Sequence, residues 1–212
     1  MIGKILLFLS LMGISYFAYD KISNLEYEQP DGILISDQPQ QILLLEEQKQ
    51  RFVVKDWQLE KVAGWAMRAR VLGKKTYFLD DISSIAPVDV AFGWGPMSDN
   101  RLLKKLDIGQ GGRFFYVSWD DQNNPPAPKD QIMHFSANMH LIPANKDVEK
   151  KLKNLRRGEL AEINGFLVNL INSDGASWLT STKRTDTGAG SCEIIYVTNV
   201  VSYQQIKFRL IK

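Results

Sequence analysis

The chain has 212 residues, of which 44% are hydrophobic and 24% are charged, as is usual for a globular protein. Its 26 Lys and Arg residues nearly balance 24 Asp and Glu residues, and the net charge of +2 gives no electrostatic reason to expect a nucleic-acid partner. Cys192 is the only cysteine, which excludes an internal disulfide and a zinc site built from several cysteines.

The first 20 residues form a long apolar segment. No charged residue lies between Ile5 and Ala18, and Lys4 stands directly before this run. A helix that crosses a bilayer needs about 20 apolar residues, with roughly 17 as the lower limit. The run ends without the small-x-small triplet that precedes a signal-peptide cleavage site. We therefore expect residues 1–20 to be an uncleaved signal anchor, a transmembrane helix embedded in the lipid bilayer.

The charges on either side of this segment indicate its orientation. Lys4 precedes it, whereas four acidic residues between positions 20 and 31 outnumber Lys21 after it. Because positive charge stays on the cytoplasmic side, the N-terminus is expected in the cytoplasm and the body outside. The protein would then be a single-pass protein of the inner (cytoplasmic) membrane. The alternative is a buried core helix in a cytoplasmic protein.

Residues 21–50 are rich in Glu, Gln, Asp and Pro, and this composition predicts a tether. Two short apolar runs, 33–35 and 42–45, are expected to dock on the body as strands. Residues 51–212 then form a single extracytoplasmic domain, which is long enough to bury its own core.

Helical and strand patterns both occur in the first half of this domain. Residues 51–79 fit either a helix or strands, because their apolar residues match both spacings. Pro87 favours the first turn of a short helix that ends near Gly93, and Ser98 is a suitable cap for the next helix. Residues 113–119 are aromatic and β-branched, which predicts a strand.

The middle of the chain combines a loop, a strand and the clearest helix. Prolines and asparagines mark residues 120–129 as a surface loop. Residues 132–142 are expected to begin in a strand and contain both histidines. Asn145 is expected to cap a helix that Gly158 ends.

The last part of the chain has the pattern of a β meander over residues 158–212. A long strand is expected at 159–171, bent at Gly165, and another at 192–203. A small barrel in this region is compatible with the pattern. The fold class predicted is α+β: an N-terminal transmembrane helix followed by a mixed domain rich in antiparallel strands.

One candidate site for catalysis pairs Cys192 with His140. A thiolate nucleophile needs a neighbour that takes its proton or stabilises its charge. The order His140, Cys192, Arg209 resembles that of sortases, membrane-anchored β-barrel transpeptidases, and the resemblance implies those three residues as catalytic. In place of the sortase Thr-Leu-x-Thr strand, Gly190 and Ser191 precede the cysteine. The alternative is that Cys192 packs as a small apolar residue.

The candidate binding residues are Trp94, Asp99, His134, Arg184 and Asp186. A tryptophan between glycines can form an exposed platform for a sugar, a peptide or a protein, or it can fill the core. Two histidines are too few ligands for a zinc site, so no metal and no cofactor are expected.

Two further features have a common and a functional interpretation. The basic helix within residues 146–157 is usually just a solvated face, but it can also attract anionic lipid headgroups. An oligonucleotide-binding barrel over residues 158–212 would need exposed aromatic residues among basic ones, and few are present.

Three stretches of the chain resemble an uncharacterised group of bacterial membrane-anchored proteins. These stretches are residues 90–99 (VAFGWGPMSD), 136–143 (SANMHLIP) and 184–193 (RTDTGAGSCE). The resemblance implies a bacterial source and brings no activity with it.

Two functions follow from these patterns. The favoured one is a membrane-anchored extracytoplasmic protein of the bacterial envelope that binds or scaffolds another envelope protein. The alternative is an envelope cysteine enzyme of the transpeptidase or hydrolase type that uses Cys192 with His140.

Overall fold

The computed structural model describes residues 26–172, 174–183, 186 and 191–203. The anchor predicted at residues 1–20 lies outside this part of the chain. Within the described residues, no helix combines the length and the apolar character that a bilayer crossing requires.

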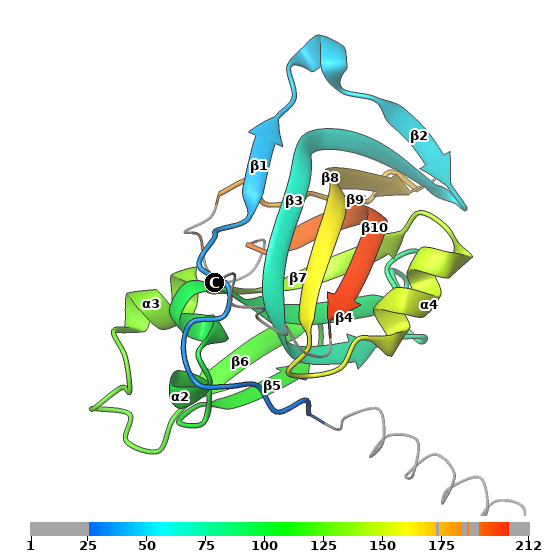
Figure 1. Cartoon of the computed structure of the whole chain (residues 1–212). Coiled ribbons are helices and arrows are strands. Elements are labelled where there is room, and N and C mark those ends of the chain that lie inside the picture. The colour runs from blue at the N-terminus through cyan, green and yellow to red at the C-terminus, as the bar shows by residue number, and fades with distance from the viewer. Residues whose placement is uncertain (1–25, 173, 184–185, 187–190, 204–212) are drawn as a thin grey trace, which may run out of the picture.

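Five strands close into a barrel (Figure 1). β3 (Trp57–Thr76) pairs with β4 (Val88–Gly93), and β4 pairs with β7 (Ser136–Pro143). β7 pairs with β10 (Glu193–Tyr203), β10 pairs with β8 (Leu160–Asn172), and β8 returns to β3. Only the β7–β10 pair is parallel, so the prediction of an α+β domain rich in antiparallel strands is confirmed.

This strand order is that of the five-stranded Greek-key barrel called the OB-fold. The helix α4 (Lys146–Asn154) connects the third barrel strand to the fourth. The barrel therefore draws three of its five strands from before residue 158. The prediction that confined a small barrel to residues 158–212 was wrong in its bounds. Among the described residues of this range, β8 and β10 belong to the ring, and its other three strands come earlier in the chain.

β3 is a single strand of 20 residues. One of its edges pairs with β8, and the other pairs in turn with β2 (Arg51–Val54), β1 (Gln40–Leu43) and β4. Of the two interpretations of residues 51–79, the strand is correct, and it ends at Thr76. The short strand β9 (Ser177–Trp178) extends the sheet beyond β8.

The short helix predicted to start at Pro87 was wrong, because β4 occupies this place. All six residues of β4 are buried. One side of the strand faces the barrel interior, and the other is covered by segments inserted between β4 and β7. A strand that is covered on both sides shows no alternation of polar and apolar residues. The sequence therefore contains no sign of a strand here, and Pro87 indicated the start of a helix.

The barrel interior and the helix α4 form the largest hydrophobic core. Asn145 accepts a hydrogen bond from the backbone N–H of Val148 at 3.0 Å, which confirms the predicted cap. One face of this helix is buried against the barrel. The core side chains include Val90, Phe92, Met139, Leu141, Val148, Leu152, Leu155, Ile163 and Ile195.

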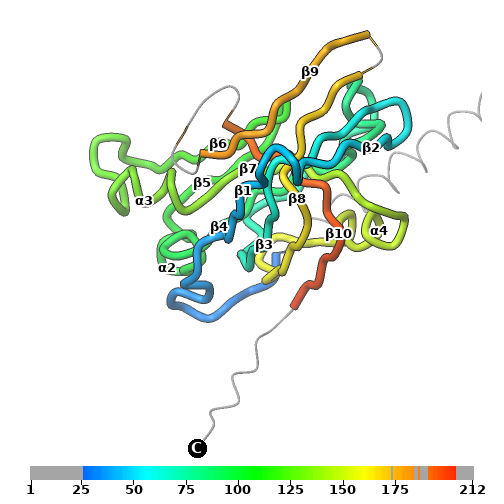
Figure 2. The backbone as a smooth tube through the Cα atoms, turned by 90° about the horizontal axis from the view of Figure 1, so that it is seen from above, coloured from blue at the N-terminus to red at the C-terminus, as the bar shows by residue number. Residues whose placement is uncertain are grey.

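The chain between β4 and β7 folds over the outside of the barrel. It comprises η2 (Gly95–Ser98), α2 (Asn100–Leu103), the hairpin β5–β6 (Asp107–Gly111 and Phe114–Ser118) and α3 (Lys129–His134). Seen from above, this insertion lies on one side of the barrel and α4 on the other (Figure 2). The prediction that residues 132–142 begin in a strand was wrong, because residues up to His134 belong to α3. His140 does lie in a strand, β7.

Residues 26–36, called the strap below, lie against the body rather than apart from it. Ile35 is buried in the barrel core cluster, although residues 33–35 form no strand. The strap contacts the turn after β4, where Ser98 accepts hydrogen bonds from the backbone N–H groups of Leu34 and Ile35, each at 3.1 Å.

Candidate functional site

A cleft opens on the outside of the barrel beside the hairpin β5–β6. It holds about 160 Å³, roughly ten times the space that one buried water needs. This is room for a side chain or another small group. The lining residues are Trp94, Phe114, Phe115, Met133, Ser136, Ala137, Asn138, Lys183, Asp186, Ser191, Cys192 and Glu193.

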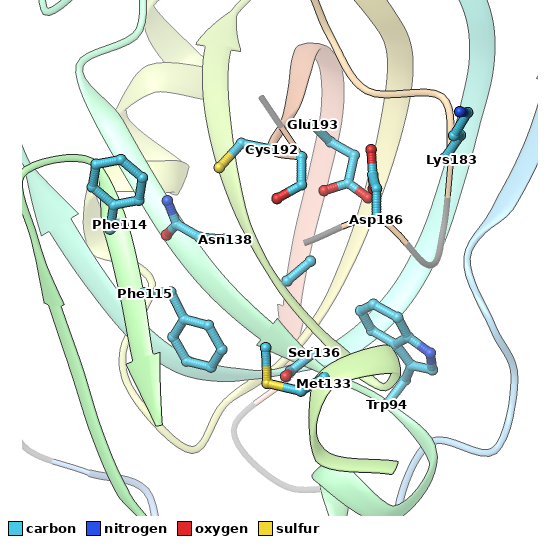
Figure 3. A pocket seen from close by; sticks show the side chains of 12 residues that line it. Trp94, Phe114, Phe115, Met133, Ser136, Asn138, Lys183, Asp186, Cys192 and Glu193 are labelled. Atoms are coloured by element: carbon cyan, nitrogen blue, oxygen red, sulfur yellow. The ribbon is translucent and has the colours of Figure 1, made fainter. Parts of the chain in front are cut away.

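Four separate parts of the chain build the walls (Figure 3). Trp94 follows β4 and lies on the same side of the cleft as Met133 of α3 and Ser136 of β7. Phe114 and its neighbour come from β6 on the opposite side. Cys192 leads into β10, and its side chain points toward the side where Asn138 lies.

Alternation along β7 explains why polar groups lie at this cleft. Met139 and Leu141 belong to the barrel core. Asn138 and His140 alternate with them and therefore face outward, yet both are buried. The inserted hairpin contacts Asn138, and Trp178 of β9 packs on the ring of His140. Polar groups buried in this way must find partners within the protein.

Asn138 fastens the hairpin to the barrel. Its Oδ1 accepts a hydrogen bond from Nε2 of Gln110 at 2.8 Å, and its Nδ2 donates to the carbonyl oxygen of Arg113 at 3.1 Å. The hairpin position, and with it the position of Phe114, is thus fixed by a residue of the cleft.

A charged cluster lies behind this wall. Arg113 donates from Nη1 to Asp89 at 2.7 Å and from Nε and Nη2 to Asp80 at 3.0 and 2.6 Å. Asp89 is fully buried, and its Oδ1 lies 2.9 Å from Nδ1 of His140. The His140 ring is tilted against that of Trp178, with the centroids 4.5 Å apart.

The turn of the hairpin places Arg113. Gly112 and Arg113 both have positive φ, 56° and 69°, and together form the two-residue loop between Gly111 and Phe114. Two consecutive left-handed residues are typical of a type I′ hairpin turn. An arginine in this conformation is uncommon, and here it aims a guanidinium at two carboxylates.

The thiol of Cys192 is set up to stay protonated. Burial raises its pKa to about 11, and the negative charges of Glu193, Asp89 and Asp186 act in the same direction. A reactive cysteine has its pKa lowered by positive charge or a helix N-terminus. Within the described residues, no hydrogen bond joins Cys192 to His140. Catalysis by this pair therefore has no support from the local electrostatics.

The structure brings some of the candidate residues together and separates others. Trp94, Asp186 and Cys192 all line the cleft, and Trp94 is also part of the core, with 1% of its surface exposed. His140 lies in the cluster with Asp89. His134 is exposed at the end of α3, and Asp99 binds the strap instead. The candidates Arg184 and Arg209 lie outside the described residues.

Sequence reasoning missed Asp89, Arg113 and Asn138. Asp89 had a signal, since it is the lone charge in the apolar run 88–92, and a charge buried among apolar residues needs a partner. The other two had none, because their role depends on how a distant hairpin folds back. Among the described residues, no group of three or more His, Cys, Asp or Glu side chains is arranged to hold a metal ion.

Comparison with known proteins gives no further assignment. No family model, no curated protein and no solved structure matches this chain.

Proposed function

We propose that this protein is a binding protein of the bacterial envelope, held at the membrane by residues 1–20, whose cleft receives part of another envelope protein. The observation that carries the proposal is the rim of the cleft. Phe114 and Met133 line the cleft and expose 46% and 48% of their surface, and the lining also contains polar side chains such as that of Asn138. Aromatic residues and methionine are enriched where proteins bind one another.

The position of the cleft supports this proposal. It lies against the outer face of β7, the third barrel strand. By analogy between folds, this is a place where ligands bind: in OB-type barrels the outer face of the second and third strands commonly receives them. Here the inserted hairpin covers much of that face. The remaining opening suits a protruding side chain or short segment better than a long polymer.

The cysteine-enzyme alternative receives no such support. A raised thiol pKa leaves few thiolates at neutral pH, and the imidazole of His140 is already in contact with Asp89 and Trp178. We retain Cys192 as a probe of the cleft rather than as a nucleophile.

Site-specific photocrosslinking in intact cells tests the binding proposal. A photoreactive amino acid at position 114 should give a discrete protein adduct, and the same residue at exposed Val53, on β2, should not. Adding Met133→Glu should reduce the adduct at 114, because a charge would then lie in the apolar rim. Equal adduct patterns at the two positions would show that the rim is no binding site.

The compartment is tested separately. A reporter fused to the C-terminus, active only outside the cytoplasm, should be active if residues 1–20 orient the chain as the charges predict. An intact protein in the soluble fraction of lysed cells would contradict the anchor.

A further inference from the structure

The strap enters the body at one fixed point, directly after α4. The backbone N–H of Tyr27 donates to the carbonyl oxygen of Arg157 at 2.8 Å, and Nε of Arg157 lies 3.3 Å from Oε2 of Glu26. Gly158 has φ of 86°, and a Cβ there would lie 2.1 Å from the carbonyl oxygen of Tyr27. This close backbone approach fixes where the chain leaves the body toward its N-terminus.

The distance from this point to the proposed anchor is limited. The apolar run ends at Tyr19, and seven Cα–Cα steps separate it from Glu26. A fully extended chain spans about 3.3–3.6 Å per residue, so the first strap residue lies within about 25 Å of the end of the run. If residues 1–20 are in a bilayer, as the proposed function requires, this side of the body is next to the lipid surface.

This side of the body is basic. Residues 146–157 contain six Lys or Arg against two acidic residues, Asp147 and Glu149. Both acids are paired with lysines of the same helix. Lys146 and Lys150 are exposed and make no ion pair with any residue that the structure describes. The helix is nine residues long, or about 14 Å, so both charges lie within that length of the helix end that leads to the strap.

We propose that the face of α4 with Lys146 and Lys150 lies against anionic lipid headgroups of the membrane that holds residues 1–20. The proposal rests on the anchor in the proposed function. Lipid is favoured over an acidic protein because the short connection places this face beside the bilayer whether or not a partner is present. Attraction to headgroups acts over about a Debye length, roughly 10 Å.

The orientation has a consequence for the cleft. The insertion with β5–β6 and α3 lies on the opposite side of the barrel from α4 (Figure 2). With α4 on the membrane, the rim at Phe114 and Met133 faces away from the lipid. The two proposals are therefore geometrically compatible: one side of the barrel binds the membrane and the other remains accessible to an envelope partner.

The experiment uses the full chain, reconstituted into vesicles, with Cys192→Ser as background. A fluorophore is attached at Asn154→Cys on α4 or, as a matched control, at Val53→Cys on β2; both positions are exposed. Headgroup-attached quencher reports proximity to the lipid surface. With phosphatidylglycerol present, quenching at 154 should exceed that at 53 and should weaken as salt rises from about 0.1 to about 0.5 M.

Charge removal tests the assigned residues. Each basic residue near an anionic surface changes the binding constant by about fivefold, so Lys146→Gln with Lys150→Gln should weaken surface binding by roughly 25-fold. Lys49→Gln with Lys129→Gln removes the same charge elsewhere and should change nothing.

The outcomes separate the two proposals. Flotation first shows whether the chain enters vesicles; if it does not, the anchor and the lipid contact both fail. If the chain enters but residue 154 is quenched no more than residue 53, or equally in purely zwitterionic vesicles, only the lipid contact is overturned. If the fluorescence at residue 154 changes when polyglutamate is added but not when anionic lipid is present, the face binds an acidic protein instead.

Discussion

Arg113 combines two unfavourable features in one residue. Its backbone has φ of 69°, which costs about 1 kcal/mol for a residue with a Cβ, and its charge is mostly removed from water, with 13% of the side chain exposed. Both are offset by the carboxylates of Asp80 and Asp89. Oδ2 of Asp89 is buried and accepts no hydrogen bond from a described residue, so its charge depends on Arg113.

Replacing this arginine should therefore be costly. Arg113→Met leaves the buried carboxylate of Asp89 without its partner, and breaking a buried pair in this way costs about 3–5 kcal/mol. Urea unfolding measures the loss. Adding Asp89→Asn should restore part of it, because the uncompensated charge is gone. Arg51→Met, which breaks an exposed pair with Glu60, should cost less than about 1 kcal/mol; a similar loss in both variants would refute a special role for Arg113.

The raised pKa of the Cys192 thiol predicts how its alkylation rate depends on pH. Its pKa is raised to about 11, so the alkylation rate of the folded protein should rise about tenfold per pH unit from pH 7 to near pH 11, following the thiolate fraction. In urea the same thiol should have a pKa of about 8.5 and should react faster at neutral pH. A rate that already levels off below pH 9 in the folded state would contradict the raised pKa and would support the alternative function as a cysteine enzyme.

At the scale of elements, contact with the strap accounts for two polar residues of the segment 90–99. Ser98 and Asp99 of the segment 90–99 bind strap backbone, with Oδ1 of Asp99 accepting from the N–H of Gly32 at 2.9 Å. Beneath the strap lies Arg70, which has 1% of its side chain exposed and donates to the carbonyl of Ser98 at 3.3 Å. This segment therefore positions the N-terminal connection as well as one wall of the cleft.

Ser98→Ala should loosen the strap selectively. Two strap amides, those of Leu34 and Ile35, lose their acceptor, and an unsatisfied buried donor costs about 1–3 kcal/mol. Hydrogen exchange of residues 26–36 should accelerate by roughly tenfold or more, while β8 exchanges as before. Ser36→Ala removes an exposed hydroxyl of the same segment and serves as the control. Unchanged exchange in Ser98→Ala would show that the strap is held by other contacts.

Elements with a local signal were predictable, and elements defined by their neighbours were not. α4 has a cap and an apolar face, and β6 begins with three aromatic residues followed by Val117, so both were identified. In β3, a bulge between Lys61 and Ala63 shifts the alternation, which blurred the distinction between helix and strand. The cleft could be anticipated only in part, through Trp94, Asp186 and Cys192, because the sequence does not show which segments fold over the outer face of β7.

The whole molecule depends on closure of the barrel, and closure depends on the approach of β10 to β8. Gly165, where the sequence predicts a bend, pairs in β8 with Val197 of β10, next to the register shift between Val197 and Asn199. A Cβ at this position would lie 2.1 Å from the carbonyl oxygen of Tyr196, on the paired strand β10. No side-chain rotation relieves a contact with backbone, so a residue larger than glycine must push the two strands apart.

Gly165→Ala should consequently lower the free energy of unfolding by about 3 kcal/mol, at the upper end of the usual cost of overpacking, and should do so in one cooperative transition because every barrel strand relies on the same ring. Gly64→Ala in β3 is the matched control. Its nearest neighbour would be 3.9 Å away, so the change should be within about 1 kcal/mol and can stabilise by restricting the unfolded chain. Urea unfolding followed by tryptophan fluorescence measures both. If Gly165→Ala proves as stable as Gly64→Ala, β8 and β10 are not held as closely as a closed barrel requires, and the topology itself would have to be reconsidered.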